Sequence, residues 1–372
     1  MLMKVMFLLP DILPGGAEML VRNMVCRGFS TEFDVIVCSL GRRRNSFLTQ
    51  DIERQGVKIH FLGQRALIDL TIFVRLYKLL KKEQPDVVHT HLNSVAYSLL
   101  PVSLAGIQCK MHTVHNIAKH EGKFPLRAAT LMAFRVFGYI PIGISRIIGG
   151  SIKSYYGVKR VPIINNGIPT ANYTRNEEFR YRKRKSLGVC EGDFVCIHIG
   201  RFVEQKNHDL LIRAFALAQM NEKRLKLLLV GDGYLMNVIY QKVITYGVQE
   251  RVQFLGIRKD VSALLNASDL FVFSSDWEGL PLTLIEAMSS GLPVISTNVG
   301  GISDLVMDGV TGFLSPPGDA KALAARITQL ASDPVFAENL GRAGRQWAQE
   351  AFDIEKTVLA HEALYGSGPH CH

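Results

Sequence analysis

The sequence lacks several features that mark membrane, secreted and metal-binding proteins. Its apolar runs are too short to span a bilayer, which needs about 20 residues. The first run, Val5 to Leu9, is cut by Pro10 and is too short for the core of a signal peptide. None of the six cysteines forms a CxxC pair, so we expect reduced, buried thiols in a cytoplasmic protein. At the C-terminus we expect a disordered tail rather than a metal grip by His370, Cys371 and His372.

Positive charge is concentrated in the first part of the chain, whose 372 residues predict two domains. Residues 1–165 hold 22 Lys and Arg against 10 Asp and Glu, whereas the remainder is nearly neutral. This asymmetry predicts an anionic partner on the N-terminal side, either an anionic acceptor or an anionic membrane surface. Nucleic acid is the competing partner, but no recognition helix, zinc-finger spacing or aromatic RNA-binding motif supports it.

The clearest local pattern runs from Leu270 to Ser296. The apolar run Leu270–Phe273 is typical of a buried strand, and a loop separates it from Pro281, which suits the first turn of a helix. Gly291 ends that helix, and Pro293–Ser296 is a second apolar strand. Strand, loop, helix and strand in this order build a parallel sheet.

Two glutamates flank the start of this helix. Glu278 lies on the loop and Glu286 lies in the helix, about two turns further along the chain, with free backbone N–H groups between them. Because a carboxylate can accept hydrogen bonds from two vicinal hydroxyls, the pair suits a ligand with two diols and a phosphate, such as a sugar nucleotide. An ordinary strand-to-helix turn with surface acids is the alternative.

Further candidate residues follow other predicted strands. Arg201 and Lys206 come after the strand Phe194–Gly200, where a guanidinium fork and a point charge suit a diphosphate. His115 follows the strand Lys110–Val114, a position that points into the cleft of an open parallel sheet, although a satisfied core histidine is the alternative.

Three features of the N-terminal half stay open between two interpretations. The glycines of Gly15-Gly16 precede a helix and either let the backbone approach a phosphate or form a plain turn. The basic amphipathic helix Leu67–Lys82 either lies on an anionic membrane or packs on the sheet. The apolar segment Phe124–Phe137 either meets a lipid-linked acceptor or packs. We assign His89 a structural role and leave His91 undecided.

The run EGLPLTLIEAMSSGLPVISTNVGG, which begins at Glu278, resembles the signature of retaining glycosyltransferases with the GT-B fold, in particular family 4. The GGAE turn at Gly15, the Asn166-Gly167 pair and the DGxTGxL segment Asp308–Leu314 extend the resemblance over nearly the whole chain. It implies an α/β protein of two Rossmann-like, doubly wound domains facing across a cleft. Residues 1–165 would bind the acceptor, residues 166–350 would bind the nucleotide sugar, and residues 351–372 would form a helix crossing back to the first domain, plus a tail.

The resemblance also implies roles for single residues. Glu278 matches the residue that touches the transferred sugar, Glu286 takes the ribose hydroxyls, and Arg201 and Lys206 hold the donor phosphates. His115 matches the histidine that contacts the sugar near the reacting carbon. The predicted donor-binding set also includes Gly15, Gly16, Gly279, Leu280 and Leu282, and the base is read at about residues 254–258.

We therefore expect a retaining hexosyltransferase that moves a sugar from a nucleotide diphosphate to a hydroxyl of a glycan or lipid-linked acceptor. A UDP-sugar is the favoured donor, with GDP-mannose next, and the expected pathway is bacterial surface polysaccharide or lipopolysaccharide synthesis. The resemblance and the missing DxD run imply no obligatory metal and no cofactor besides the nucleotide sugar. The expected location is cytoplasmic, with peripheral contact to the inner face of the cytoplasmic membrane through the basic N-terminal domain.

Two alternatives come from other classes. A sugar-nucleotide epimerase of the same fold is disfavoured by the combination of Glu278 and Glu286 with Arg201 and Lys206. A non-enzymatic sugar- or nucleotide-binding protein is disfavoured by the absence of a recognisable signal peptide.

Overall fold

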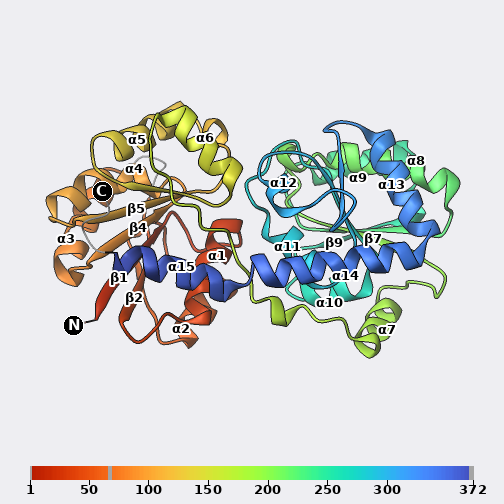
Figure 1. The fold of residues 1–372 in the computed structure, drawn as a ribbon, viewed down its shortest axis with the longest axis horizontal. Helices are drawn as coiled ribbons and strands as arrows, with labels where there is room; N and C mark the ends of the chain where they lie inside the picture. Colours follow the sequence, from red (N-terminus) through yellow and green to blue (C-terminus); the bar gives the residue numbers. More distant parts are fainter. Residues whose placement is uncertain (1, 66–68, 368–372) are drawn as a thin grey trace. The chain divides into compact units, whose positions relative to one another are not determined.

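The computed structural model describes residues 2–65 and 69–367. The chain divides into two compact units, shown with their helices and strands in Figure 1. Unit 1 comprises residues 1–168 and 354–372, and unit 2 comprises residues 169–353. The metal grip considered at residues 370–372 lies outside the described residues. No helix within the described ranges is long and apolar enough to cross a membrane.

Unit 1 is built on a six-stranded parallel sheet with the strand order β3-β2-β1-β4-β5-β6. Its strands are β1 (Met3–Leu9), β2 (Phe33–Ser39), β3 (Lys58–Phe61), β4 (Val87–His91), β5 (Cys109–Val114) and β6 (Ile140–Gly143). Its helices are α1 (Gly16–Arg27), α2 (Phe47–Arg54), α3 (Thr71–Glu83), α4 (Ser94–Leu104), α5 (Phe124–Arg135), α6 (Arg146–Tyr156) and α15 (Ile354–Gly366).

Unit 2 repeats this plan with a second parallel sheet, in the order β12-β11-β10-β7-β8-β9. Its strands are β7 (Phe194–Ile199), β8 (Leu225–Val230), β9 (Val252–Gly256), β10 (Leu270–Phe273), β11 (Val294–Thr297) and β12 (Phe313–Ser315). Its helices are α7 (Glu177–Ser186), α8 (His208–Asn221), α9 (Met236–Thr245), α10 (Val261–Ala267), α11 (Leu282–Ser289), α12 (Ile302–Leu305), α13 (Ala320–Ser332) and α14 (Pro334–Ala351).

Both sheets have the doubly wound order, in which the chain starts near the middle and winds out to each edge in turn. Their central strands are buried on both faces, which explains why residues 5–9 and 270–273 read as continuous apolar runs rather than as alternating ones. The predicted fold class, α/β with two doubly wound sheets, is confirmed. In each unit the carboxyl ends of the central strands lie at one edge of the sheet, which is where such folds bind ligands.

The C-terminal helix α15 packs within unit 1. Its Glu355 forms an ion pair with Arg27 at the end of α1, with 2.6 Å between Nη2 and Oε1. Further along the helix, the hydroxyl of the buried Tyr365 lies 2.7 Å from Nδ1 of His89 on β4. The last helix is therefore joined both to the surface and to the interior of this unit.

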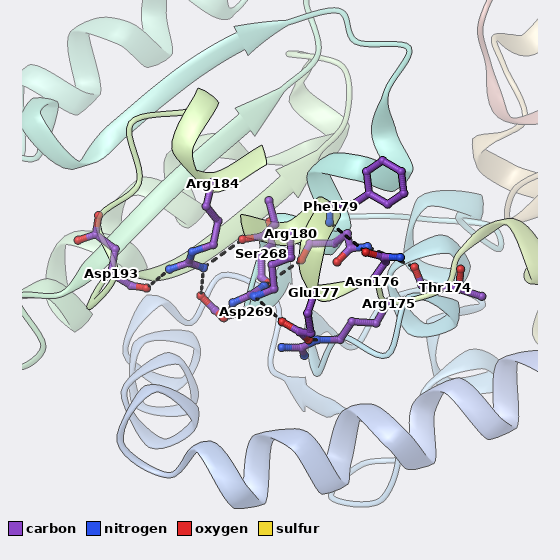
Figure 2. A network of polar contacts seen from close by, with 12 residues as sticks. Thr174, Arg175, Asn176, Glu177, Phe179, Arg180, Arg184, Asp193, Ser268 and Asp269 are labelled. Atoms are coloured by element: carbon purple, nitrogen blue, oxygen red, sulfur yellow. Dashed lines mark hydrogen bonds and ion pairs between the residues drawn. The ribbon is translucent and has the colours of Figure 1, made fainter. Parts of the chain in front are cut away.

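Helix α7 is fastened to the sheet of unit 2 by two arginines that converge on Asp269, the residue before β10 (Figure 2). Arg184 Nη1 lies 2.9 Å from one carboxylate oxygen of Asp269, and Arg180 contacts the other. The backbone N–H of Val195 on β7 also donates to Asp269, at 2.8 Å. One partly buried carboxylate thus joins α7, β7 and β10.

Replacing Asp269 by alanine should lower the free energy of unfolding of unit 2 by about 3 kcal/mol, because two guanidinium groups and one backbone donor lose their partner together. Both tryptophans, Trp277 and Trp347, belong to unit 2, so denaturation followed by tryptophan fluorescence reports on this unit. The matched control is Glu338→Ala, which removes an exposed ion pair to Arg342 and should change stability by less than about 1 kcal/mol. Equal losses in the two variants would contradict this role for Asp269.

Candidate functional site

Two loops of unit 2 are joined at the carboxyl ends of β7 and β10. The first ends in a single 3-10 turn, Glu204–Lys206, and the second follows β10. The backbone N–H of Asp276 donates to the Gln205 carbonyl and the Gln205 amide donates to the Trp277 carbonyl, both at 2.9 Å. The side-chain amide of Asn207 donates to Asp276 at 2.8 Å. These bonds fix the residues that the two loops carry.

An ion pair between Lys206 and Glu278 lies where these loops meet. Lys206 Nζ is 2.5 Å from Glu278 Oε1, and both side chains are largely buried. The ammonium group also lies 4.5 Å from the centre of the Phe273 ring. Burial of a charge is unfavourable unless the charge is paired, so each residue stabilises the position of the other. The structure therefore brings together two residues that the sequence singled out separately.

A glycine makes this arrangement of Glu278 sterically feasible. Gly300 has a φ of +54°, and a Cβ at this position would lie 1.8 Å from the Glu278 carbonyl oxygen. Any side chain would therefore push the 276–281 loop away from the loop that follows β11. The Gly300-Gly301 turn after β11 thus allows the backbone of Glu278 to pack closely against it.

Glu286 lies on α11, five residues after Pro281, and is buried. Burial raises the pKa of its carboxyl group to about 7, and a hydrogen bond to Tyr173 opposes this shift. The group can therefore change its charge near neutral pH. Tyr173 lies in a segment without a recognisable motif, and no pattern in the sequence indicated it as a partner.

The other predicted donor-binding residues of unit 2 differ in their exposure. Arg201 follows β7 and is exposed, and its guanidinium forms no ion pair with a described residue. Gly279, Leu280 and Leu282 are buried at the start of α11. Arg201 thus has its charge available to an anion, while Lys206 is already paired.

In unit 1 the two predicted glycines begin a helix at the end of β1. Gly15 is the N-cap of α1 and Gly16 is its first residue, which is exposed. The glycine turn is thus placed at the carboxyl edge of the sheet, as are the histidines of the neighbouring strands.

The last residue of β4, His91, and the first residue after β5, His115, form a pair. Nδ1 of His91 lies 2.9 Å from Nε2 of His115, and burial lowers the pKa of His115 to about 3 and that of His91 well below its ordinary value. Both rings are therefore neutral at physiological pH. His89, by contrast, has both ring nitrogens satisfied inside the unit, by Tyr365 and by Thr113 at 2.7 Å.

A buried acid, Glu121, supports the turn that carries His115. Its Oε1 accepts a hydrogen bond from the backbone N–H of His115 at 2.9 Å. Burial raises its pKa to about 8, against the effect of the hydrogen bonds from the backbones of His115 and Asn116. Sequence reasoning missed this residue, because a single glutamate in a polar loop gives no pattern.

Within the described ranges, no group of three or more His, Cys, Asp or Glu side chains is placed to hold a metal ion. The site can instead bind an anion through Arg201 and Lys206, and hydroxyl groups through the two glutamates. These groups lie on unit 2, beyond the carboxyl ends of its central strands, where doubly wound folds typically bind nucleotides.

The family follows from comparison with known proteins. Residues 14–172 match the model of Glycosyltransferase Family 4, and residues 179–347 match that of Glycosyl transferases group 1. The chain belongs to the GT-B glycosyltransferases of family 4, and it is a transferase enzyme. The resemblance noted from the sequence is confirmed.

Three similar proteins illustrate this relationship. The UDP-Gal:alpha-D-GlcNAc-diphosphoundecaprenol alpha-1,3-galactosyltransferase of Escherichia coli is 29% identical over 353 residues, which cover 90% of this chain and 89% of that protein. The N-acetyl-alpha-D-glucosaminyl L-malate synthase of Bacillus anthracis is 38% identical over 182 residues, about half of each chain (49% and 48%). The structure of Anabaena Alr3699/HepE in complex with UDP and glucose has a TM-score of 0.87 at 23% identity, covering 98% and 100% of the two chains, and it shows the fold alone.

Stability should depend on the protonation of Glu286. Its pKa in the folded state, about 7, lies above the ordinary value of 4.5, so the folded protein binds more protons than the unfolded protein between these pH values. The free energy of unfolding of unit 2 should therefore fall as pH rises through this window, by at most about 1.4 kcal/mol per pH unit from this group.

The variant Glu286→Gln should reduce this fall, measured as the difference from wild type in denaturation followed by tryptophan fluorescence across the same pH range. Glu338→Gln, at an exposed position on α14, is the control and should follow the wild type. A Glu286→Gln profile parallel to that of the wild type would show that folding does not change the protonation of this carboxyl group and would contradict the raised pKa.

Proposed function

We propose that the protein transfers a sugar from a UDP-sugar to a hydroxyl of a lipid-linked glycan, with retention of the anomeric configuration. The observation that carries the proposal is the buried pair Lys206–Glu278, with the exposed Arg201 after the same strand. The Escherichia coli relative is named for UDP-Gal and for an acceptor on diphosphoundecaprenol, and the Anabaena structure contains UDP, which supports this choice of donor and acceptor.

The main barrier is cleavage of the bond between the anomeric carbon and the diphosphate. Negative charge grows on the leaving phosphate, where Arg201 and Lys206 stabilise it together with the start of α11. Positive charge grows on the sugar at the same time. Glu278 accepts hydrogen bonds from the sugar hydroxyls, and its negative charge stabilises the positive charge on the sugar. Glu286 binds the ribose diol.

Retention follows from attack on the face that the phosphate leaves. The bond from the anomeric carbon to the phosphate oxygen breaks, and a bond to the acceptor oxygen forms on the same side. The proton of the acceptor hydroxyl passes to the departing phosphate, so no protein nucleophile is required. His115 lines the sugar as a neutral imidazole, held in orientation by His91.

Two further assignments belong to the proposal. The Gly15–Gly16 turn approaches the donor phosphate or the acceptor with its backbone, and residues 254–258 read the base. No obligatory metal takes part, because Arg201 and Lys206 supply the positive charge that a metal would otherwise bring to the diphosphate, and the sequence has no DxD run.

We also place the reaction at the cytoplasmic face of a bacterial membrane, in surface polysaccharide synthesis. An undecaprenol-linked acceptor of the kind named for the Escherichia coli relative is held in the bilayer by its lipid. The excess of 22 basic over 10 acidic residues in residues 1–165 favours approach to an anionic lipid surface.

Incubation with a panel of UDP-, GDP- and ADP-sugars, with and without a lipid-linked acceptor, tests the class of donor. We expect UDP release from one UDP-sugar, stimulated by the acceptor, and a product whose anomeric configuration equals that of the donor by NMR. Thermal stabilisation by UDP without release of UDP from any UDP-sugar would support the donor site and show that the protein needs a different acceptor. Release of GDP alone would contradict the assigned donor.

The variants Lys206→Ala and Glu278→Ala should each lower kcat/KM by roughly 100-fold or more, because each removes a charge that stabilises the transition state. Either single change leaves a buried charge unpaired, so the double variant Lys206→Met/Glu278→Gln distinguishes lost chemistry from lost folding. The exposed Lys321→Ala on α13 is the control and should keep full activity. Near wild-type rates in the folded double variant would overturn the site.

A further inference from the structure

We infer that helix α5 of unit 1 inserts its outer face into the surface of an anionic membrane, and that this face is the protein's lipid-docking surface. The inference rests on the proposed lipid-linked acceptor, and it names the part of the chain that meets the lipid. Two observations carry it, the apolar side chains on the outside of α5 and the near absence of acids around them.

The outer face of α5 is apolar where a surface helix is ordinarily polar. Phe124 is 75% exposed, Leu131 42% and Met132 46%, and Val136 directly after the helix is 71% exposed. Leu131 and Met132 lie seven and eight positions after Phe124, and this spacing places all three on one side of the helix. We call these four residues the α5 stripe.

The stripe is not the side of α5 that packs in unit 1. Thr130, Ala133 and Phe134 face the interior, where the Phe134 ring lies 5.3 Å from the ring of Tyr156. The neighbouring helix α4, which packs against α5, adds the exposed Leu100 and Leu104. Figure 1 shows α5 at the periphery of unit 1, beside α4 and α6. Exposed apolar side chains gathered in this way mark a surface that binds a partner.

The charge around the stripe identifies the partner. Residues 87–165 contain nine Lys and Arg and a single acid, Glu121, which is buried. Lys119 and Lys123 are exposed immediately before α5, and Arg127 lies on its flank. An apolar stripe bordered by cations suits a membrane of anionic lipids, which takes up the side chains and attracts the charges. A second copy of the chain would bring the same cations face to face, which opposes self-association through this surface.

The basic helix α3 is a poorer candidate, although its sequence is more amphipathic. Ile72, Leu76 and Leu80 are fully buried in the core of unit 1, so its apolar face is already used by the sheet. Leu70, the N-cap of α3, and Val74 in its first turn are exposed apolar residues. The packing interpretation of this helix therefore holds, and these two residues provide a matched control for the stripe.

The test is co-sedimentation of the full chain with vesicles of phosphatidylcholine, with and without phosphatidylglycerol. The wild type should bind only the anionic vesicles, and binding should weaken with added salt. Phe124→Ser/Leu131→Ser should lower the affinity for anionic vesicles by about tenfold or more, and Lys119→Glu/Lys123→Glu should lower it similarly while reducing the salt dependence. The control Leu70→Ser/Val74→Ser, on α3, should bind as the wild type.

Other outcomes overturn the inference. Equal binding to neutral vesicles would remove the role of charge, and a loss confined to the α3 control would move the docking surface to that helix. If size-exclusion chromatography shows a wild-type dimer that the α5 variant converts to a monomer, the stripe is an interface between copies.

A readout without lipid separates this inference from the proposed function. Stabilisation of the α5 variant by UDP and its release of UDP from a soluble donor should equal those of the wild type, because the stripe is not part of the donor site. Activity on the membrane-embedded acceptor should fall with vesicle affinity. A wild type that releases UDP but does not bind anionic vesicles would overturn the docking surface and leave the transferase assignment intact.

Discussion

The ion pair between Lys206 and Glu278 is the interaction on which the geometry of the candidate site in unit 2 depends. Its two residues lie 72 positions apart in the chain, on the loops after β7 and β10, which are neighbouring strands in the sheet. A buried cation and a buried carboxylate are each unfavourable alone, so the two loops gain stability only when they close on each other. The hydrogen bonds of Gln205 and the close approach of Gly300 follow from that closure, since both hold the backbone near Glu278. A pair of opposite charges also suits the proposed function of the site. A ligand that carries both an anion and hydroxyl groups can offer the anion to Lys206 and the hydroxyl groups to Glu278 in place of their mutual contact.

In unit 1 the buried polar groups at the carboxyl ends of β4 and β5 also need partners, but they are neutral histidines rather than an ion pair. Burial keeps the imidazoles of His91 and His115 uncharged, and their mutual hydrogen bond satisfies one nitrogen of each. Glu121 holds the backbone of the turn and Tyr365 of α15 holds the neighbouring His89. Helix α15 therefore contributes to the order of this histidine cluster although it follows the rest of unit 1 by almost two hundred residues, from Ile168 to Ile354. One face of α15 is thus part of the interior of unit 1.

The sequence predicted what depends on local pattern and on motif. Continuous apolar runs such as Leu270–Phe273 identified the strands, because a strand buried on both faces leaves no polar alternation. Lys206 and Glu278 were each assigned to the site, yet their direct pairing was not predicted, since it depends on which strands are neighbours in the sheet. Glu121 was missed for the same reason: its role comes from a fold that buries one loop acid beside a strand end. Which side of a helix is exposed could not be predicted either, because the exposure of Phe124 depends on which elements pack against α5.

The excess of positive charge in the first part of the chain comes mainly from a lack of acidic residues in residues 87–165. About one residue in nine is basic both in residues 87–165 and in the whole chain, so this region is not enriched in Lys and Arg. It is depleted of acids, and its one acid is buried with a pKa raised to about 8, so it adds little negative charge at neutral pH. In residues 1–86, by contrast, basic side chains meet acidic ones, as Arg22 does with Asp51 at 2.6 Å. The positive field of unit 1 therefore arises over the half of the sheet that carries β4 to β6. That half also carries His115, so the surface suited to anionic lipid and the residue assigned to the sugar are built on the same strands.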